Sequence, residues 1–202
     1  GVEFLFKKNK ITHLKGVGLI KDQNTVVVKD NSGKNLEYRT KKIVVSTGSI
    51  PSSLPGIKID EKIIVSSTGA LSFSNIPKDL VIIGGGYIGL EMGSVWNRLG
   101  SKVTIIEFLD NIIPEMDKDI SNDFLKILKK QGIDFKLNSK VTGVTSLKNK
   151  AIVNFTENKN SKNEKIECDN VLVAVGRKPN IGVEIAKLGI KLDNDKRIKI
   201  NE

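Results

Sequence analysis

The sequence predicts an α/β protein built around a parallel sheet, and three observations carry this prediction. Apolar runs of strand length alternate with helical patterns between residues 80 and 137, which is typical of strand–helix–strand units. Glycines directly follow the apolar runs at 80–83 and 171–175, beginning at Gly84 and at Gly176. Short segments of alternating polarity occupy residues 141–167 and indicate a β-meander. Strands that are joined by helices in this way are expected to form right-handed crossovers within one sheet.

The composition suits a folded chain of one large domain or two small ones. It has 202 residues, of which 39% are hydrophobic, enough for a sizeable core. The one cysteine, Cys168, excludes an internal disulfide, and the one histidine, His13, leaves no histidine pair for zinc, so we expect no metal site. No apolar run approaches the ~20 residues of a membrane span, and the chain opens without a signal peptide. The absence of an initiator methionine indicates a cut or processed piece.

The net charge is strongly basic, +10 with a pI near 9.6, which is compatible with nucleic acid or another acidic partner. However, only four of the 33 basic residues are arginines, and the lysines are scattered singly or in pairs. Aromatic residues make up 5% of the chain, too few for a platform on which bases stack. We therefore expect solvated surface lysines and no nucleic-acid binding.

The first 75 residues have the pattern of short strands followed by a crossover between two domains, 1–75 and 76–202. A continuous apolar strand is expected at 43–45, where it ends at a glycine turn. The Ser- and Pro-rich stretch 50–78 is expected to form the crossover and to end at Pro77. Shorter strands are expected at 11–20, 25–28 and 35–38, with a turn at 30–33.

The remaining residues repeat a strand–helix pattern. One helix follows the glycines and ends at Gly100; another begins at the acids Asp117 and Asp119 and ends at Gly132. This second helix is expected to be amphipathic, with one apolar face made of Ile120, Phe124, Ile127 and Leu128. Strands are expected at 80–83, 102–107, 134–137 and 171–175 in the parallel sheet, and at 141–147, 151–156 and 165–167 in the meander.

The glycines after the first parallel strand follow the pattern Gly84-x-Gly86-x-x-Gly89 at the start of a helix. Gly84 is expected to make the tight turn, Gly86 to let a pyrophosphate approach the backbone, and Gly89 to let the helix pack closely on the sheet. Gly93, on the same helix face, would extend this close packing. The helix N-terminus offers N–H groups and a positive dipole to phosphates. In a strand–helix–strand context, the pattern predicts a Rossmann-like dinucleotide-binding domain.

Glu107 ends the second strand of this unit, 23 residues after Gly84, where the dinucleotide-binding pattern expects an acid. A carboxylate accepts hydrogen bonds from the ribose hydroxyls and repels a 2′-phosphate, whereas an NADP site favours arginine. Residues 108–111 contain no base. The sequence therefore favours NAD over NADP.

Other chemically interesting residues have simpler interpretations. Cys168 lies between two acids and has no basic neighbour to lower its pKa, so we expect a small buried filler rather than a nucleophile. His13 has no partner carboxylate in view. Met92 and Trp96 stand at helical spacing and are expected in the core.

A faint internal similarity suggests a second, related fold. Residues 43–51 and 172–179 are both apolar strands that end in Gly-x-x-Pro, and both follow a set of short β segments. Two similar nucleotide-binding folds, the first of them incomplete, would explain this similarity.

Residues 84–100, read as Gly-Gly-Gly-Tyr-Ile-Gly-Leu-Glu-Met-Gly-Ser-Val-Trp-Asn-Arg-Leu-Gly, resemble the NAD-binding segment of the dihydrolipoamide dehydrogenase family. Within the wider flavoprotein disulfide reductases, the Ser-Val-Trp-x-Arg-Leu-Gly part is fairly specific for this family. The resemblance implies FAD/NAD(P)-binding domains, with 1–75 as the C-terminal part of the FAD-binding domain and 76–202 as the NAD-binding domain, ending before the FAD Gly-Asp motif. Further matching stretches lie at 103–109, 128–143, 47–56 and 175–180.

The resemblance also implies an activity and partners. Enzymes of this family oxidise the dihydrolipoyl groups of 2-oxo-acid dehydrogenase complexes, and electrons pass through a disulfide and FAD to NAD. The implied partners are NAD(H), the lipoyl domains of those complexes, the domain that binds this component within them, and a second subunit in a homodimer. The implied compartment is the bacterial cytoplasm or the mitochondrial matrix.

The resemblance assigns cofactor contacts but no catalytic residue to this chain. The family's redox cysteine pair and its catalytic His–Glu pair have no counterpart here, so the chain is expected to bind NAD without turnover. Another NADH-linked flavoprotein reductase, or a non-enzymatic binding or assembly module with an acidic partner, stays open as an alternative. The implied NAD contacts are Gly84, Gly85, Gly86, Tyr87, Ile88, Gly89, Leu90, Glu91, Glu107, Val141 and Gly176; the implied FAD contacts are Gly18, Thr47, Gly48 and Ser49.

Overall fold

The computed structural model of the chain describes residues 1–157, 162–182, 185 and 188–200. The chain forms two compact units, which we call the first unit (Gly1–Ile50 with Lys178–Glu202) and the second unit (Pro51–Arg177). The units separate at 50/51 and 177/178, and the domain boundary expected at residue 75 stays a prediction. The separation arises because Ile57 and Ile64 are buried in a core of the second unit, and because the Asn180 N–H donates to the Gly48 carbonyl in the first.

The second unit contains a five-stranded sheet in which all neighbouring strands are parallel. The strand order is β5-β12-β6-β7-β8. Strand β12, which follows the meander, therefore lies between β5 of the crossover and β6, which precedes the glycines. The parallel sheet expected from the sequence is therefore confirmed. The strands are β5 (Ile64–Val65), β12 (Asn170–Val173), β6 (Asp79–Ile83), β7 (Lys102–Ile106) and β8 (Asp134–Lys136).

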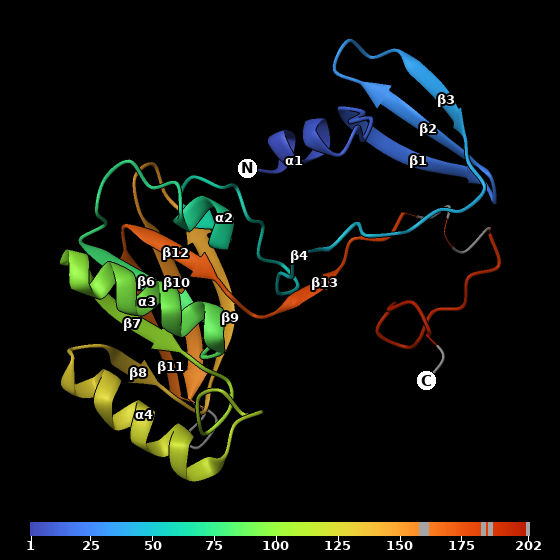
Figure 1. The fold of residues 1–202 in the computed structure, drawn as a ribbon. Coiled ribbons are helices and arrows are strands. Elements are labelled where there is room, and N and C mark those ends of the chain that lie inside the picture. Colours follow the sequence, from blue (N-terminus) through green and yellow to red (C-terminus); the bar gives the residue numbers. More distant parts are fainter. Residues whose placement is uncertain (158–161, 183–184, 186–187, 201–202) are drawn as a thin grey trace. The chain divides into compact units, whose positions relative to one another are not determined.

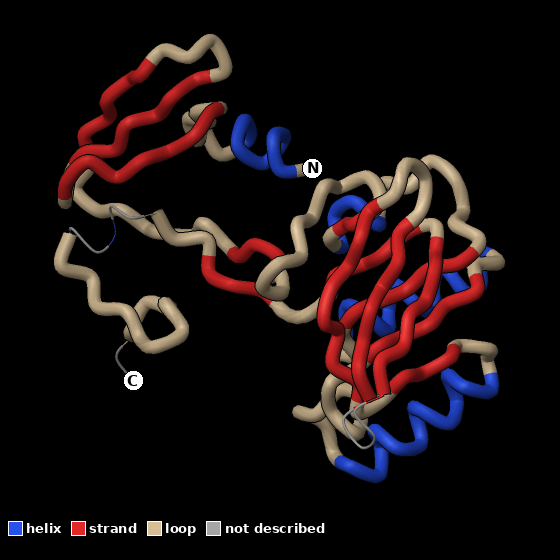
Figure 2. The backbone as a smooth tube through the Cα atoms, turned by 180° about the vertical axis from the view of Figure 1, so that it is seen from behind, coloured by secondary structure: helices blue, strands red, loops and turns tan. Residues whose placement is uncertain are grey.

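Two layers cover the two faces of this sheet. In Figure 1, α3 (Tyr87–Leu99) lies in front of the sheet, and Figure 2 shows three antiparallel strands over the opposite face. These strands form the expected meander in the order β11-β10-β9; residues 158–161 of its turn lie outside the described residues. The remaining elements of the unit are β9 (Ser139–Ser146), β10 (Ala151–Glu157), β11 (Lys162–Cys168), α2 (Ser67–Ala70) and α4 (Lys118–Lys130).

The parallel strands are buried on both faces, which explains their continuous apolar sequence. Successive side chains of a strand point to opposite faces, so Leu80 and Ile82 pack in the cluster that includes Trp96 of α3. Val81 and Ile83 pack in the cluster that includes Phe155 of the meander. Trp96 and Met92 are buried, as expected for core residues.

Both long helices have the predicted ends. The residue after α3, Gly100, has φ 110 and makes a left-handed C-cap. Helix α4 is capped by Asp117, whose carboxylate accepts the N–H of Asp119 at 2.9 Å and that of Ile120 at 3.4 Å. Gly132, shortly after α4, has φ 97.

The predicted apolar face of α4 is only partly correct. Leu128 is buried, whereas Ile120 and Ile127 are 56% and 52% exposed. The buried side of the helix includes Ser121 instead, whose hydroxyl donates to the Ile112 carbonyl oxygen at 2.5 Å. This polar anchor turns the side of Ile120 outward, which the apolar spacing alone does not reveal.

The first unit contains α1 (Val2–Lys8) and an antiparallel sheet of β1 (Gly16–Asp22), β2 (Thr25–Asp30) and β3 (Asn35–Arg39). The strands predicted at 25–28 and 35–38 are confirmed, while the first strand begins only at Gly16. The strand predicted at 43–45 is wrong, because no described segment pairs with it and Val44 is 86% exposed. Strands β4 (Ser49–Pro51) and β13 (Arg177–Pro179) pair with each other and contain the two points where the chain passes between units.

Candidate functional site

A cavity of about 780 Å³ in the second unit opens at the carboxyl ends of its parallel strands. The turns after β6, β7 and β12 all contribute residues. In doubly wound α/β folds this edge binds ligands, at the point where successive connections leave to opposite sides of a strand. The lining residues are Leu54, Pro55, Ile83, Gly84, Gly86, Tyr87, Ile88, Ile106, Glu107, Phe108, Leu109, Pro114, Glu115, Ser139, Lys140, Val141, Thr142, Ala174, Val175 and Gly176.

The three glycines of the turn after β6 occupy different environments. Gly84 has φ +110, and a Cβ there would lie 2.5 Å from the carbonyl oxygen of Ala174. A Cβ on Gly89 would collide with the carbonyl oxygen of Gly84, so α3 approaches the strand too closely for a side chain. A Cβ on Gly86 would meet no atom within 4 Å. The space beside Gly86 is therefore open to a ligand, while the other two positions are closed.

The glycine turn is held by hydrogen bonds to the neighbouring strand and loop. The Gly84 N–H donates to the Ile106 carbonyl at 2.9 Å, and the Ile113 N–H donates to the Gly85 carbonyl at 3.0 Å. The Gly85 N–H donates to Oε2 of Glu107 at 2.6 Å. The turn is thus rigid before any ligand arrives, which lowers the entropic cost of binding.

Both carboxylate oxygens of Glu107 bind backbone N–H groups. Oε2 accepts the Gly85 N–H, and Oε1 accepts the Leu109 N–H at 2.9 Å. Each carboxylate oxygen has two lone pairs, so one acceptor site on each oxygen is still available for a hydroxyl group. Glu107 is half-buried, and its two backbone bonds fix the carboxylate at the wall of the cavity.

Not all of the predicted NAD contacts line the cavity. Gly85 is engaged with Glu107, Gly89 lies against the strand, Leu90 is buried in the core beneath α3, and Glu91 is exposed to solvent. The predicted residues that the structure brings together around the cavity are Gly84, Gly86, Tyr87, Ile88, Glu107, Val141 and Gly176.

Sequence reasoning missed most of two short segments of the cavity wall. Phe108, Leu109, Pro114 and Glu115 come from the loop after β7, and Ser139, Lys140 and Thr142 flank the predicted Val141 at the start of β9. Both segments follow a parallel strand, directly or within a few residues. Their position at the carboxyl end of a strand was the available signal.

Tyr87 and Glu115 form a contact between the start of α3 and the loop after β7. The Tyr87 hydroxyl donates to Oε2 of Glu115 at 3.3 Å. The Glu115 carboxylate raises the pKa of the Tyr87 phenol above its ordinary value through its negative charge. Both side chains are exposed and line the cavity.

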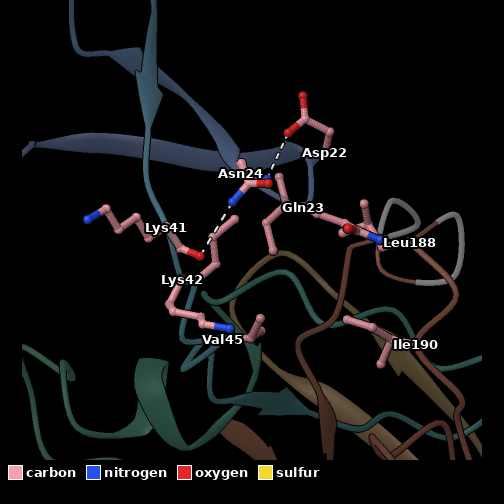
Figure 3. A pocket seen from close by; sticks show the side chains of 10 residues that line it. Asp22, Gln23, Asn24, Lys41, Lys42, Val45, Leu188 and Ile190 are labelled. Carbon is pink, nitrogen blue, oxygen red and sulfur yellow. Dashed lines mark hydrogen bonds between the residues drawn. The ribbon is translucent and has the colours of Figure 1, made fainter.

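The residues implied as FAD contacts lie in the first unit, but none of them lines the cavity found in that unit (Figure 3). Gly18 lies within β1, and the carbonyl oxygens of Thr47 and Gly48 accept hydrogen bonds from Asn180 at 3.2 Å and 2.9 Å. Neither these residues nor Ser49 belong to the ten residues that line this cavity. The FAD contacts implied by the resemblance therefore stay a prediction.

The cavity of the first unit has a volume of about 440 Å³ and a mixed polar and apolar lining (Figure 3). At its rim, the Asn24 side chain donates to the carbonyl oxygens of Thr40 and Lys41, and the Asn24 N–H donates to Asp22 at 2.8 Å. Leu188 and Ile190 contribute apolar surface. These contacts indicate a turn stabilised by Asn24.

Cys168 is a buried core residue, as expected. Its thiol donates weakly to the Ala151 carbonyl oxygen at 3.7 Å, and burial raises the pKa of the thiol to about 12. His13 makes an edge-on contact with the ring of Phe6. Neither residue has the surroundings of a catalytic nucleophile or base.

We expect Cys168 to react with a thiol reagent at pH 8 only after unfolding. At pH 8 the folded thiol is neutral and shielded, and burial raises its pKa from 9.0 to about 12. Because the unfolded thiol ionises at lower pH, this residue's contribution to stability is complete below pH 9 and declines as pH rises toward 12. Labelling with and without denaturant measures this difference, and rapid labelling of the folded chain would contradict the assignment.

The described residues contain no group of three or more His, Cys, Asp and Glu side chains placed to hold a metal ion. Among the same residues, no helix is both long enough and apolar enough to cross a bilayer.

Comparison with protein families identifies one match along the whole chain. The family model described as pyridine nucleotide-disulphide oxidoreductase matches residues 1–202. A dihydrolipoamide dehydrogenase of Chaetomium thermophilum is 48% identical over 204 residues, covering 100% of this chain and 40% of that protein. The mitochondrial dihydrolipoyl dehydrogenase of Pisum sativum is 47% identical, again covering 100% of this chain and 40% of the relative. A leghemoglobin reductase of Glycine max is also 47% identical, covering 100% of this chain and 39% of its own length.

Solved structures give a consistent result. The HOCl-induced flavoprotein disulfide reductase RclA from Escherichia coli matches with a TM-score of 0.82 and 30% identity, over 99% of this chain and 46% of that chain. Its Cu(II) complex matches with a TM-score of 0.83 and 30% identity, over 98% of this chain and 46% of that one. The chain spans about two fifths of the length of these curated relatives.

Proposed function

The chain belongs to the pyridine nucleotide-disulphide oxidoreductase family, and we propose that its second unit binds NAD(H) in the cavity at the carboxyl ends of β6, β7 and β12. In this proposal residues 76–202 form the NAD-binding domain, and residues 1–75 are the C-terminal part of an FAD-binding domain. The observation that carries the proposal is the open space beside Gly86, next to a rigid glycine turn and the start of a helix.

The proposed position of the pyrophosphate follows from the chemistry of the helix N-terminus. Helix α3 begins after Gly86 and has no side-chain cap, so its first-turn N–H groups are available to an anion. A phosphate can approach the backbone of Gly86 because no Cβ occupies that space. Gly85, Gly89 and Leu90, which do not line the cavity, are proposed to shape this turn around the nucleotide.

The proposed position of the ribose follows from Glu107. Its fixed carboxylate has one acceptor site left on each oxygen, which suits the two hydroxyls of an adenosine ribose. Val141, which lines the same cavity, is proposed to lie against the adenine. Ile88, Tyr87, Glu91 and Gly176 are proposed to lie towards the nicotinamide half of the molecule.

For the longer protein of which such chains are part, we propose oxidation of dihydrolipoyl groups through a disulfide and FAD to NAD. Relatives at 47–48% identity that are named dihydrolipoamide or dihydrolipoyl dehydrogenase support this activity. Lipoyl domains, the domain that binds this component in 2-oxo-acid dehydrogenase complexes and a second subunit are the proposed partners. Because several of the relatives are named mitochondrial, they favour the mitochondrial matrix over the bacterial cytoplasm.

A second candidate function is the transfer of electrons from NADH to another electron acceptor. It is favoured by relatives of equal similarity that are named leghemoglobin reductase. Either way, we expect this chain alone to show no dihydrolipoamide–NAD turnover. It contains one cysteine, and a redox disulfide requires two.

Calorimetric titration of the chain with NADH and NADPH at fixed ionic strength tests the proposal. We expect NADH to bind at least about tenfold more tightly than NADPH, since a carboxylate at the ribose repels a 2′-phosphate and tenfold corresponds to about 1.4 kcal/mol. Absent binding of NADH, or equal binding of both nucleotides, would refute the proposed site. Measurable dihydrolipoamide–NAD turnover by this chain would refute the separate expectation that it lacks the reacting groups.

A further inference from the structure

An exposed apolar row runs along α4, apart from the proposed NAD site. Its members, Ile120, Phe124 and Ile127, are 56%, 36% and 52% exposed. They are separated by four and then three residues, so they lie along one side of the helix. We propose that this row is an interface between two copies of the chain, in which their α4 helices pack antiparallel.

The place of α4 in the fold leaves this row accessible. In Figure 1 the helix lies at one edge of the second unit, beside β8, which is the last strand of the parallel sheet. Ser121 and Leu128 face the interior, and the apolar row lies to one side of them. Single exposed apolar side chains are ordinary, whereas a contiguous apolar patch marks an interaction surface.

Charged residues form a second row beside the apolar one. Asp119 and Asp123 belong to the first half of the helix, and Lys126 and Lys130 belong to the second half. These four side chains are exposed, and each stands one position before the apolar row or its continuation. The charged row is therefore acidic towards the start of α4 and basic towards its end.

Two-fold symmetry makes this charged row complementary to itself. In an isologous contact the same surface of both copies meets. With the axis between positions 124 and 125, Asp119 faces Lys130 of the second copy, and Asp123 faces Lys126 of the second copy. Within each helix Asp123 also pairs with Lys126 at 2.8 Å, so charges of opposite sign alternate around the axis. A parallel pair of helices would instead place acid against acid.

The same register interlocks the apolar rows. Ile127 of one copy falls opposite position 122 of the other, between Ile120 and Phe124. Lys118 and Lys129 lie on the opposite side of the helix and stay outside the contact. Since a helix of 13 residues is only about 20 Å long, the interface is smaller than that of a permanent dimer. We expect a weak dimer with a dissociation constant of about 100 μM.

Sedimentation equilibrium of the chain without nucleotide tests the apolar part of this interface, over about 10 μM to 1 mM. We expect Ile127→Ser to weaken dimerisation about tenfold, because both copies lose an apolar contact. The matched control is Ile76→Ser. Ile76 is 53% exposed and lies before β6 rather than on α4, so its replacement should leave the dimer unchanged. Thermal unfolding checks that both variants are folded.

Charge reversal tests the antiparallel register. Asp119→Lys and Lys130→Glu each place like charges opposite one another, so at low ionic strength we expect each variant alone to dimerise about fivefold more weakly. An equimolar mixture of the two variants should regain the lost affinity, because each reversed charge then faces its opposite. Both substitutions also disfavour the helix dipole, but mixing leaves that effect in place and cannot produce the recovery.

Three outcomes overturn the inference: a chain that stays monomeric over this concentration range, a dimer that Ile127→Ser leaves intact, and variants that associate no better together than alone. A monomeric chain would leave the apolar row to a partner of different sequence, such as the rest of the longer protein. No described residue that lines the proposed NAD cavity lies in α4. Titration with NADH therefore judges the proposed NAD site separately.

Discussion

Replacing Gly86 by valine should weaken NADH binding about a hundredfold or more while leaving the second unit folded. Gly86 has φ −79 and ψ −179, an extended conformation that valine adopts without strain, and a Cβ there meets no atom within 4 Å. The side chain would fill the space proposed for the pyrophosphate and remove its hydrogen bonds to the start of α3. Losing two charge-assisted bonds weakens binding about a hundredfold or more, which titration with NADH measures.

The matched control is the same substitution three residues later. A side chain at Gly89 collides with the carbonyl oxygen of Gly84 and also meets Cγ2 of Ile82 at 3.3 Å. We expect Gly89→Val to lower the free energy of unfolding by about 3 kcal/mol through overpacking, and Gly86→Val by less than about 1 kcal/mol. If both variants unfold alike, or if Gly86→Val binds NADH normally, the open space beside Gly86 is not the phosphate site.

The parallel sheet could be predicted from the sequence because its strands are buried on both faces. Leu80, Val81, Ile82 and Ile83 form an uninterrupted apolar run, and alternate members pack against α3 and the meander. The end of α3 could be predicted equally directly, since the left-handed C-cap at Gly100 favours a residue without a Cβ. These features depend on local conformation and on burial, which single positions reveal.

The predictions that were wrong concern residues whose burial depends on other parts of the chain. The run at 43–45 is apolar enough for a buried strand, but no described segment pairs with it. The spacing of Ile120 and Ile127 fits a buried helix face, but the hydrogen bond of Ser121 turns that side towards solvent. An apolar side chain can be buried, but whether it is buried depends on the elements that pack beside it.

The residues of the candidate site also differ in how well the sequence predicts them. Glu107 could be located from its spacing after Gly84, because the length of one helix and one strand fixes that distance along the chain. Glu115 could not, since it lies in irregular backbone and meets Tyr87 only through the tertiary fold. The spacing that locates Glu107 is thus local in sequence, whereas the contact between Tyr87 and Glu115 is not.

Replacing Glu107 by alanine should weaken NADH binding about a hundredfold and also destabilise the second unit. The carboxylate accepts the N–H groups of Gly85 at 2.6 Å and Leu109 at 2.9 Å. Because Gly85 is buried, its unpaired N–H costs about 1–3 kcal/mol of folding free energy. Loss of two hydrogen bonds to the ribose accounts for the change in affinity, which titration measures alongside thermal unfolding.

Glu107→Gln separates these two roles, because glutamine keeps the size of the side chain but has only one acceptor oxygen. Its NH₂ group must then face one of the two backbone N–H groups, so we expect a partial loss of stability and NADH binding about tenfold weaker. NADPH should lose less affinity than NADH, since the charge that repels a 2′-phosphate is gone. If Glu107→Ala stays folded and binds NADH within about threefold of the original affinity, Glu107 serves only to hold the glycine turn, and the ribose must bind elsewhere.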